Sequence, residues 1–124
     1  MKYIETNKAP KAIGPYSQGI VLGNMIYTSG QIPINPETGN IESDDIISQT
    51  HQAIKNLENI LLAASSSLDN VVKTIVFVKN IKDFTTINEI YATYFKNKPA
   101  RSLVEVSALP KGALIEIEAV ALIK

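Results

Sequence analysis

Apolar side chains recur every three or four residues in two segments, a period that predicts helices with one buried face. The first segment begins after the N-cap candidates of positions 43–45 and ends at the serine run 65–67. Its apolar face consists of Ile47, Thr50, Ile54, Leu57, Leu61 and Ala64. The second segment begins at its expected cap, Asp83, and stops before Pro99. Its inner face consists of Phe84, Ile87, Ile90, Tyr91, Tyr94 and Phe95.

Runs of β-branched and aromatic residues predict the strands. These are a hairpin of residues 20–22 and 25–28 around Gly23-Asn24, a central strand at 71–78, and two later strands at 102–106 and 113–123. Proline and glycine in residues 1–18 predict an irregular arm with one short strand. Proline, asparagine and glycine in the segment 33–40 predict a loop. The order β-β-α-β-α-β-β predicts an α/β fold of the α+β type, with two helices on one face of a mixed sheet.

The last predicted strand carries information about assembly because its side chains alternate between two faces. One face, suited to the helices, consists of Ile115, Ile117, Ala119, Ala121 and Ile123. The other face consists of Leu114, Glu116, Glu118, Val120 and Leu122. Three of these five are large and apolar, which is unusual for a solvated surface. We therefore expect an oligomer that covers this face, with Glu116 in or beside the subunit interface.

Length and charge narrow the class of protein. The 124 residues fit a single domain, 1–124, that can bury its own core. The formal net charge is zero, which argues against a broad nucleic-acid or anionic-membrane surface. The sequence has no cysteine and no apolar run near the roughly 18 residues of a membrane span. These features predict a cytoplasmic protein without membrane or nucleic-acid partners.

Several common catalytic arrangements are missing from the sequence. Gly14 and Gly19 have P-loop spacing, but Ile20-Val21 stands where Lys-Ser/Thr is required. No His, Cys or carboxylate cluster suits a metal. The single histidine, His51, is expected to face solvent from the first helix.

Arg101 and Glu116 are the charged residues with the clearest candidate roles. Arg101 is the single arginine among eleven lysines, which suits either a bidentate grip on a carboxylate or phosphate, or a surface salt bridge. Glu116, on a partly apolar face, suits an acid or base with a raised pKa, or a structural ion pair within the oligomer. Tyr16 and Ser29 lie in glycine-flanked loops, where site residues and ordinary turn residues both occur.

Sequence blocks along almost the whole chain resemble the RidA (YjgF-type) family. They are Ala12-Ile13-Gly14-Pro15-Tyr16-Ser17-Gln18, Thr28-Ser29-Gly30-Gln31-Ile32-Pro33, Ser67-Leu68-Asp69-Asn70-Val71-Val72-Lys73-Thr74, Pro99-Ala100-Arg101-Ser102 and Ile115-Glu116-Ile117-Glu118-Ala119. The resemblance implies a chorismate-mutase-like fold, a homotrimer with sites between subunits, and no cofactor or metal.

The same resemblance implies a deaminase that hydrolyses 2-iminobutanoate and 2-iminopropanoate to 2-keto acids and ammonia. These imines are released by pyridoxal-phosphate-dependent dehydratases. Arg101 would hold the substrate carboxylate and Glu116 would lie near the attacking water. The remaining implied site residues are Tyr16 and Ser29, which line the cleft, Gly30, which makes a backbone contact, and Asn88, near the pocket.

Leu103 departs from the family, because many bacterial relatives carry a cysteine in the pocket there. Regulation through that thiol is therefore not expected, and a leucine narrows and dries the substrate-binding wall. The alternatives to the enzyme are a non-catalytic keto-acid sensor, a chaperone-like protein, and an RNA-directed role as a ribonuclease or translation inhibitor. Zero net charge counts against the RNA-directed role.

Overall fold

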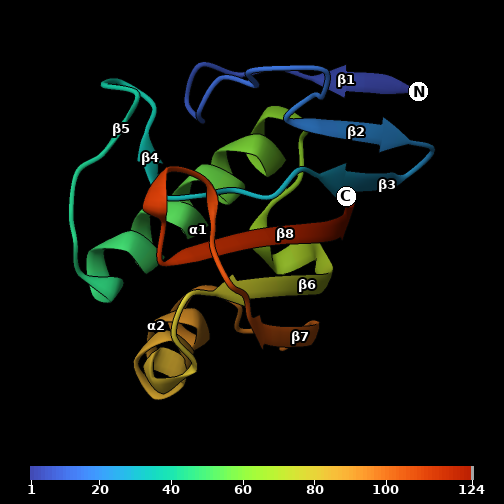
Figure 1. The fold of residues 1–124 in the computed structure, drawn as a ribbon. Helices are drawn as coiled ribbons and strands as arrows, with labels where there is room; N and C mark the ends of the chain where they lie inside the picture. Colours follow the sequence, from blue (N-terminus) through green and yellow to red (C-terminus); the bar gives the residue numbers. More distant parts are fainter. Residues whose placement is uncertain (124) are drawn as a thin grey trace.

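The computed structural model describes residues 1–123, which form one mixed sheet with two helices packed against it. The sheet order is β1-β2-β3-β8-β6-β7 (Figure 1). Its strands are β1 (Lys2–Ile4), β2 (Gly19–Leu22), β3 (Met25–Thr28), β8 (Ile115–Leu122), β6 (Val71–Val78) and β7 (Ala100–Glu105). All neighbours are antiparallel except β6 and β7, which are parallel. The predicted hairpin and the central strand at 71–78 are confirmed.

Helix α1 (Ile46–Ala63) passes behind the strands in Figure 1, and α2 (Phe84–Tyr94) lies at the lower left beside β6 and β7. The two helices contact each other and share one core with the sheet, so that the opposite face is open. The predicted α+β fold with helices on one face is thus confirmed. Residues from both helices and the sheet form one buried apolar cluster, which includes Ile54, Leu57, Ile87, Val76 and Ile117. Neither helix is long and apolar enough to cross a membrane, within the residues described.

The long helix α1 begins where the sequence predicts, with one change in its buried face. The Asp45 side chain accepts a hydrogen bond from the Ser48 N–H at 2.7 Å and caps the helix. Ile47, expected on the inner face, is 52% exposed. It lies on the same side of the helix as Ile54, but the first turn extends past the strands in Figure 1. Ala53 and Ile60 complete the buried stripe instead.

The start of α2 corrects two predictions. Asp83 has helical backbone angles and makes no side-chain cap bond. Asn80 caps this region: its side chain accepts from the Lys82 N–H at 3.0 Å and starts a 3₁₀ turn, Ile81–Asp83, that runs into α2. Phe84, expected on the inner face, is 41% exposed because the turn places it at the edge of the helix–sheet contact.

One loop region also differs from the sequence prediction. The segment expected as a loop contains a small hairpin of β4 (Ile34–Asn35) and β5 (Asn40–Ile41). The buried Asn56 of α1 anchors it, because its Nδ2 donates to the carbonyls of Ile32 at 3.0 Å and Ile34 at 2.8 Å. Hydrogen bonds to a residue distant in sequence fix this hairpin, so a local pattern did not reveal it.

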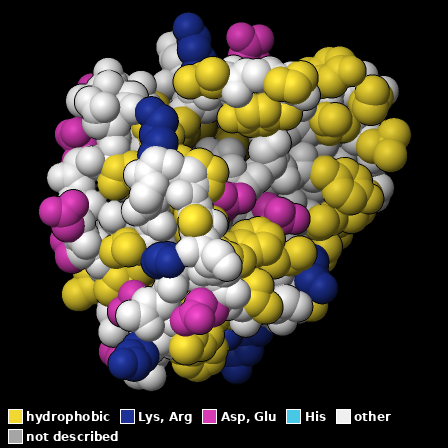
Figure 2. Space-filling view, viewed as in Figure 1, with side chains coloured by type: hydrophobic (Ala, Val, Ile, Leu, Met, Phe, Trp, Pro, Cys, Tyr) yellow, Lys and Arg dark blue, Asp and Glu magenta, His cyan; other side chains and the backbone are white. Residues whose placement is uncertain are grey.

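The two faces of β8 have the predicted division. Ile115, Ile117, Ala119 and Ala121 are buried against the helices, whereas the alternate residues Glu116, Glu118 and Val120 are half-buried. Figure 2 shows the open face, where acidic side chains lie near the centre among apolar ones. The large exposed apolar side chains that the register places on this face are Tyr3, Leu22, Tyr27, Val104 and Leu122.

The N-terminal arm is held by one buried amide, that of Gln18. Its Oε1 accepts from the Thr6 N–H at 2.7 Å. Its Nε2 donates to the carbonyls of Thr6 at 2.9 Å, Pro10 at 2.8 Å and Ala9 at 3.3 Å. These backbone groups are partly shielded from water, so the hydrogen bonds from the Gln18 side chain stabilise the arm.

We therefore expect Gln18→Ala to lower the free energy of unfolding by about 2–3 kcal/mol, because it leaves several part-buried backbone groups unpaired. Urea unfolding at one fixed protein concentration measures the change. Asn59→Ala is the matched control: it removes a single exposed bond to the Lys8 carbonyl and should cost no more than about 1 kcal/mol. Equal losses for the two variants would contradict the role of Gln18.

Candidate functional site

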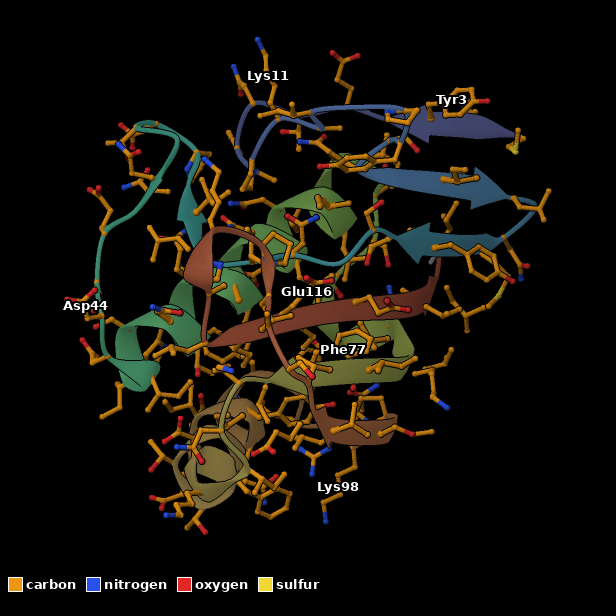
Figure 3. All side chains as sticks on the ribbon, viewed as in Figure 1. Tyr3, Lys11, Asp44, Phe77, Lys98 and Glu116 are labelled. Atoms are coloured by element: carbon orange, nitrogen blue, oxygen red, sulfur yellow. The ribbon has the colours of Figure 1, made fainter. Side chains whose placement is uncertain are left out.

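Glu116 lies on the open face of β8, next to Phe77 of β6, with which it is paired in the sheet (Figure 3). An isolated bridge between Gln31 and Ile117 brings the segment after β3 against β8. The Gln31 N–H donates to the Ile117 carbonyl at 2.7 Å, and the Ile117 N–H donates back at 3.0 Å. This bridge places Gly30 directly against the Glu116 carboxylate.

Gly30 leaves the space that the Glu116 carboxylate occupies in this close approach. A Cβ at position 30 would overlap Glu116 Oε2 and lie 2.7 Å from Cδ, closer than side-chain carbons approach. The approach exists because regular pairing between β3 and β8 stops after Tyr27. There the Thr28 Oγ1, in place of a backbone carbonyl, accepts from the Ala119 N–H at 3.0 Å. The interruption lets the chain of residues 28–30 bend over Glu116.

Ser29 joins this bend to the segment that carries Tyr16. Its N–H donates to the Gln18 carbonyl at 2.9 Å, and its Oγ donates to the Ser17 carbonyl at 2.6 Å. With its proton used in this way, the hydroxyl oxygen is free to accept a hydrogen bond. Tyr16 is 54% exposed and lines the same groove as Ser29. We call Tyr16, Ser29, Gly30 and Glu116 the glutamate half-site.

The environment of Glu116 disfavours its ionised form. Partial burial raises the pKa of the carboxyl group, and the negative charge of Glu118, two residues along the same face, raises it further. A carboxylate with a raised pKa is suited to proton transfer near neutral pH.

Arg101 is held from several sides in a second location, which we call the arginine half-site together with Asn88 and Tyr91. Its Nη1 donates to the Asn88 Oδ1 at 2.8 Å. Its guanidinium carbon lies 4.7 Å from the centre of the Tyr91 ring and 5.7 Å from that of Phe84. These contacts with α2 fix the plane of the guanidinium and leave other N–H groups for a ligand.

Tyr91 is itself fixed, because its hydroxyl forms a 2.8 Å hydrogen bond with the buried Thr74 and its ring stacks on Phe95. Burial raises the pKa of Tyr91, so the phenol stays neutral beneath the cation. The helical pattern predicted Tyr91 as a core residue, and nothing in the sequence indicated its contact with Arg101. A pocket of about 400 Å³ adjoins this half-site and is lined by Asn88, Tyr91, Ala92, Phe95, Lys96, Lys98, Pro99 and Arg101.

The register places the two half-sites on opposite faces of the sheet. Arg101 pairs with Thr74, which pairs with the buried Ala119, so Arg101 belongs to the helix-covered face. Glu116 pairs with Phe77 on the open face. Strand β7 begins two residues earlier than the sequence predicted, at Ala100, and this extension brings Arg101 into the sheet. A single chain therefore does not bring Arg101 and Glu116 together.

Leu103 and His51, also considered from the sequence, lie outside the glutamate half-site. Leu103 is two residues from Arg101 on the same face of β7 and packs against the apolar core. His51 is exposed on α1, as expected, and its Nδ1 lies 2.6 Å from the Tyr94 hydroxyl. Within residues 1–123, no group of three or more His, Cys, Asp or Glu side chains is placed to hold a metal ion.

The structure defines a small α+β protein with one open, partly apolar sheet face and two polar half-sites on opposite faces of the sheet. Residues 6–123 match the family model described as Endoribonuclease L-PSP. The chain belongs to this family, and the resemblance to RidA-type proteins is confirmed by its relatives.

Three of these relatives illustrate the similarity. The 2-iminobutanoate/2-iminopropanoate deaminase of Escherichia coli K12 is 51% identical over 97% of this chain and 96% of its own length. The structure of YyfA from Yersinia pestis, of the Rid family, has a TM-score of 0.95 and 54% identity, and covers 98% of both chains. Escherichia coli TdcF with bound serine has a TM-score of 0.94 and 45% identity, with 98% of both chains covered.

The raised pKa of Glu116 leads to a test that does not depend on function. In Glu118→Gln the like charge is removed, so the pKa of Glu116 should fall. NMR titration of the side-chain carboxyl carbon follows this change directly. Glu105→Gln, which alters an exposed carboxylate on β7, is the control and should leave the titration of Glu116 unchanged. An unchanged pKa in Glu118→Gln would show that the two carboxylates are not coupled.

Proposed function

We propose that this protein is a deaminase that hydrolyses 2-imino acids, with 2-iminobutanoate and 2-iminopropanoate as substrates. The observation that carries the proposal is the deaminase name of relatives that are 51–52% identical over nearly the whole chain. The two half-sites supply the groups that this reaction needs, as set out below.

The reaction adds water to a carbon–nitrogen double bond. Protonation of the imine nitrogen makes the carbon electrophilic, and water forms a new C–O bond there. Loss of a proton from the added oxygen and transfer of a proton to nitrogen break the C–N bond. The products are the 2-keto acid and ammonia. These imines also hydrolyse in plain water, so the enzyme has to raise the rate of hydrolysis only modestly. A site that orients the substrate and the water is enough for this.

In this proposal Arg101 binds the substrate carboxylate. The planar guanidinium offers parallel N–H groups that match a carboxylate, and Asn88, Tyr91 and Phe84 already fix its orientation. The TdcF structure contains serine, a small molecule with the same carboxylate next to a nitrogen-bearing carbon. Leu103, next along this face of β7, contributes an apolar wall to the substrate pocket.

Glu116 is the proposed acid–base group. Its carboxylate positions the attacking water and accepts its proton, then returns a proton to the departing ammonia. The Gly30 N–H and the Ser29 hydroxyl oxygen, both beside Glu116, contact the substrate, and Tyr16 closes the cleft. The raised pKa of Glu116 makes its carboxylate a stronger base toward the attacking water than an ordinary carboxylate is.

The complete site in this proposal lies between subunits of a homotrimer. Arg101 and Glu116 occupy opposite faces of one chain, so each site combines the arginine half-site of one subunit with the glutamate half-site of another. The exposed apolar side chains of the open face, Tyr27 and Leu122 among them, supply an interface. Because dehydratases in the cell interior release the substrates, we also propose a cytoplasmic location.

A non-catalytic sensor is the second candidate, and the bound serine in TdcF favours it because serine is not an imine. A protein that binds amino or keto acids without turnover would use the same arginine clamp. RNA cleavage, which the family description names, has less support from this chain. Its formal net charge is zero, and we propose no nucleic-acid partner.

A coupled assay separates these candidates. A threonine dehydratase generates 2-iminobutanoate, and the release of 2-ketobutyrate is followed with and without this protein. We expect acceleration by the wild type and a loss of roughly 100-fold in kcat/KM for Arg101→Ala, since a misplaced substrate reacts slowly. Arg101→Lys should recover part of this loss, because it keeps the charge without the paired N–H groups.

Lys96→Ala is the matched control, because Lys96 is an exposed cation that lines the same pocket as Arg101. It should retain activity, and an equal loss would indicate general attraction of anions in place of a specific clamp. No acceleration by the wild type, together with binding of serine or 2-ketobutyrate by calorimetry, would overturn the enzyme and favour the sensor.

Subunit mixing tests the location of the site. Arg101→Ala and Glu116→Gln homo-oligomers should both be inactive. When the two variants are unfolded and refolded together in equal amounts, about a quarter of the sites should receive both intact residues if each site draws on two subunits. Activity near a quarter of wild type supports the shared site. If a single chain supplied both residues, mixing would restore nothing; each variant refolded alone is the control.

A further inference from the structure

Gln31 is a buried polar residue to which the chemistry proposed above gives no role. It follows Gly30 in the bend over Glu116, and its side chain is 5% exposed. Its Nε2 donates to the carbonyls of Ser29 at 3.4 Å and Gly30 at 3.3 Å. Within residues 1–123, its Oε1 is the only buried side-chain oxygen or nitrogen without a hydrogen-bond partner. Such an atom destabilises a fold, so its presence needs a physical reason.

A β-bulge turns the Gln31 side chain toward the helix-covered face. Tyr27 pairs with Val120 and Gln31 pairs with Ile117, so three residues of the first segment oppose two of β8. Without the extra residue, Tyr27 and Gln31 would share a face, since side chains alternate along a strand. Instead Gln31 is buried on the same face as Ile117, while Tyr27 is exposed on the open face. The amide therefore lies on the opposite side of this segment from Glu116.

The hydrogen bonds of Gln31 determine which end of its amide faces the bend. Carbonyl oxygens only accept hydrogen bonds, so the amide nitrogen must face the carbonyls of Ser29 and Gly30. The opposite orientation would lose both bonds and bring the Oε1 against two other oxygens. The unpartnered Oε1 is thus a consequence of holding these two carbonyls.

The position of the Ser29 carbonyl also sets the direction of the Gly30 N–H. The peptide bonds are trans, and in a trans peptide the C=O and the following N–H point in opposite directions. Because the Ser29 carbonyl is held toward the Gln31 amide, the Gly30 N–H is directed to the open face, where Glu116 lies. In the described part of the chain, the N–H groups of Ser29 and Gln31 donate to backbone carbonyls, whereas the Gly30 N–H has no such acceptor.

We propose that Gln31 is a positioning residue, which holds the Ser29–Gly30 peptide so that the Gly30 N–H is directed at the substrate beside Glu116. This inference rests on the proposed deaminase function, in which the Gly30 N–H contacts the substrate. Gln31 acts through the peptide and does not touch the substrate itself. Glycine has a flexible backbone, so a donor at this position has to be held from outside. A donor that is already oriented needs no reorganisation during the reaction.

The first test is Gln31→Met, which keeps the length of the side chain and removes both polar groups. We expect kcat/KM for 2-iminobutanoate to fall about tenfold, because the Gly30 N–H is still present but loosely oriented. The midpoint of urea unfolding should stay the same or rise, since the unpartnered oxygen is removed. A purely structural residue would give the reverse result, with a lower midpoint and unchanged activity of the folded protein.

Gln49→Met is the matched control. Gln49 is also buried, with 4% of its surface exposed, but both ends of its amide are bonded. Its Nε2 donates to the Ser43 carbonyl at 2.8 Å, and its Oε1 accepts from the Leu114 N–H at 2.8 Å. The same substitution here should lower the urea midpoint, because it leaves backbone groups unpaired, and should not change kcat/KM.

NMR observes the Gly30 N–H directly and does not depend on turnover. Protein labelled with ¹⁵N-glycine has only six labelled positions, so the signal of Gly30 can be assigned and followed. Addition of 2-ketobutyrate should shift this signal in the wild type and shift it much less in Gln31→Met. The signal of Gly39, between β4 and β5, is the internal control and should not move.

Gln31→Glu is a second variant with a readout in pH. The introduced carboxyl group can donate a hydrogen bond to the carbonyls of Ser29 and Gly30 only while it is protonated. Its activity, divided by that of the wild type at the same pH, should therefore recover as the pH falls. A ratio that is constant with pH would contradict donation by residue 31.

The possible failures of this inference and of the proposed function are distinguishable. Unchanged kcat/KM in Gln31→Met would overturn the inference, as would equal losses of activity in Gln31→Met and Gln49→Met. A Gly30 signal that 2-ketobutyrate leaves in place in the wild type would also overturn it. If the wild type does not accelerate imine hydrolysis, the proposed function fails. A Gly30 shift that is present in the wild type and lost in Gln31→Met would then still support the positioning role.

Discussion

Strand β8 lies between β3 and β6, and its alternate side chains belong to opposite faces of the sheet. Ile117 and its alternate neighbours build the core against α1, so Glu116 and Glu118 must lie on the open face. The same alternation, carried through β6 to β7, places Arg101 under α2. Core formation thus places the two charged groups of the proposed site, Arg101 and Glu116, on opposite faces of the sheet. The need for a second chain in the proposed site follows from this separation, because a sheet is only one residue thick.

Polar side chains that replace regular backbone pairing shape the site around this sheet. Gln18 holds the N-terminal arm, and Ser29 ties the end of β3 to the segment carrying Tyr16. Thr28 closes the interruption between β3 and β8. These bonds bend the chain so that Gly30 touches Glu116. Partial burial of the Glu116 carboxyl group, together with the charge of Glu118, raises its pKa. The contact between Gly30 and Glu116 therefore depends on bonds that a regular sheet would not have made.

The arginine half-site follows a different design, in which rigid elements hold the cation. Two rings and an amide from α2 surround the Arg101 guanidinium, and Thr74 fixes the ring of Tyr91. A clamp that is already oriented loses little entropy when a carboxylate binds. Imine hydrolysis needs only moderate acceleration, so a fixed clamp and one carboxylate are sufficient. In the proposed mechanism, the arginine half-site orients the substrate and the glutamate half-site transfers protons.

The sequence alone determined the helix faces, the central strand, the two faces of β8 and the family, because these depend on local period and contiguous motifs. It also selected Arg101, by its rarity, and Glu116, by its place on a half-apolar strand. The tertiary structure decided the cap of α2, the hairpin of residues 34–41, the contact of Tyr91 with Arg101 and the opposite faces of Arg101 and Glu116. Each depends on strand register or on hydrogen bonds between residues far apart in the chain. A local pattern contains no information on such pairings, since they form only when the whole sheet does.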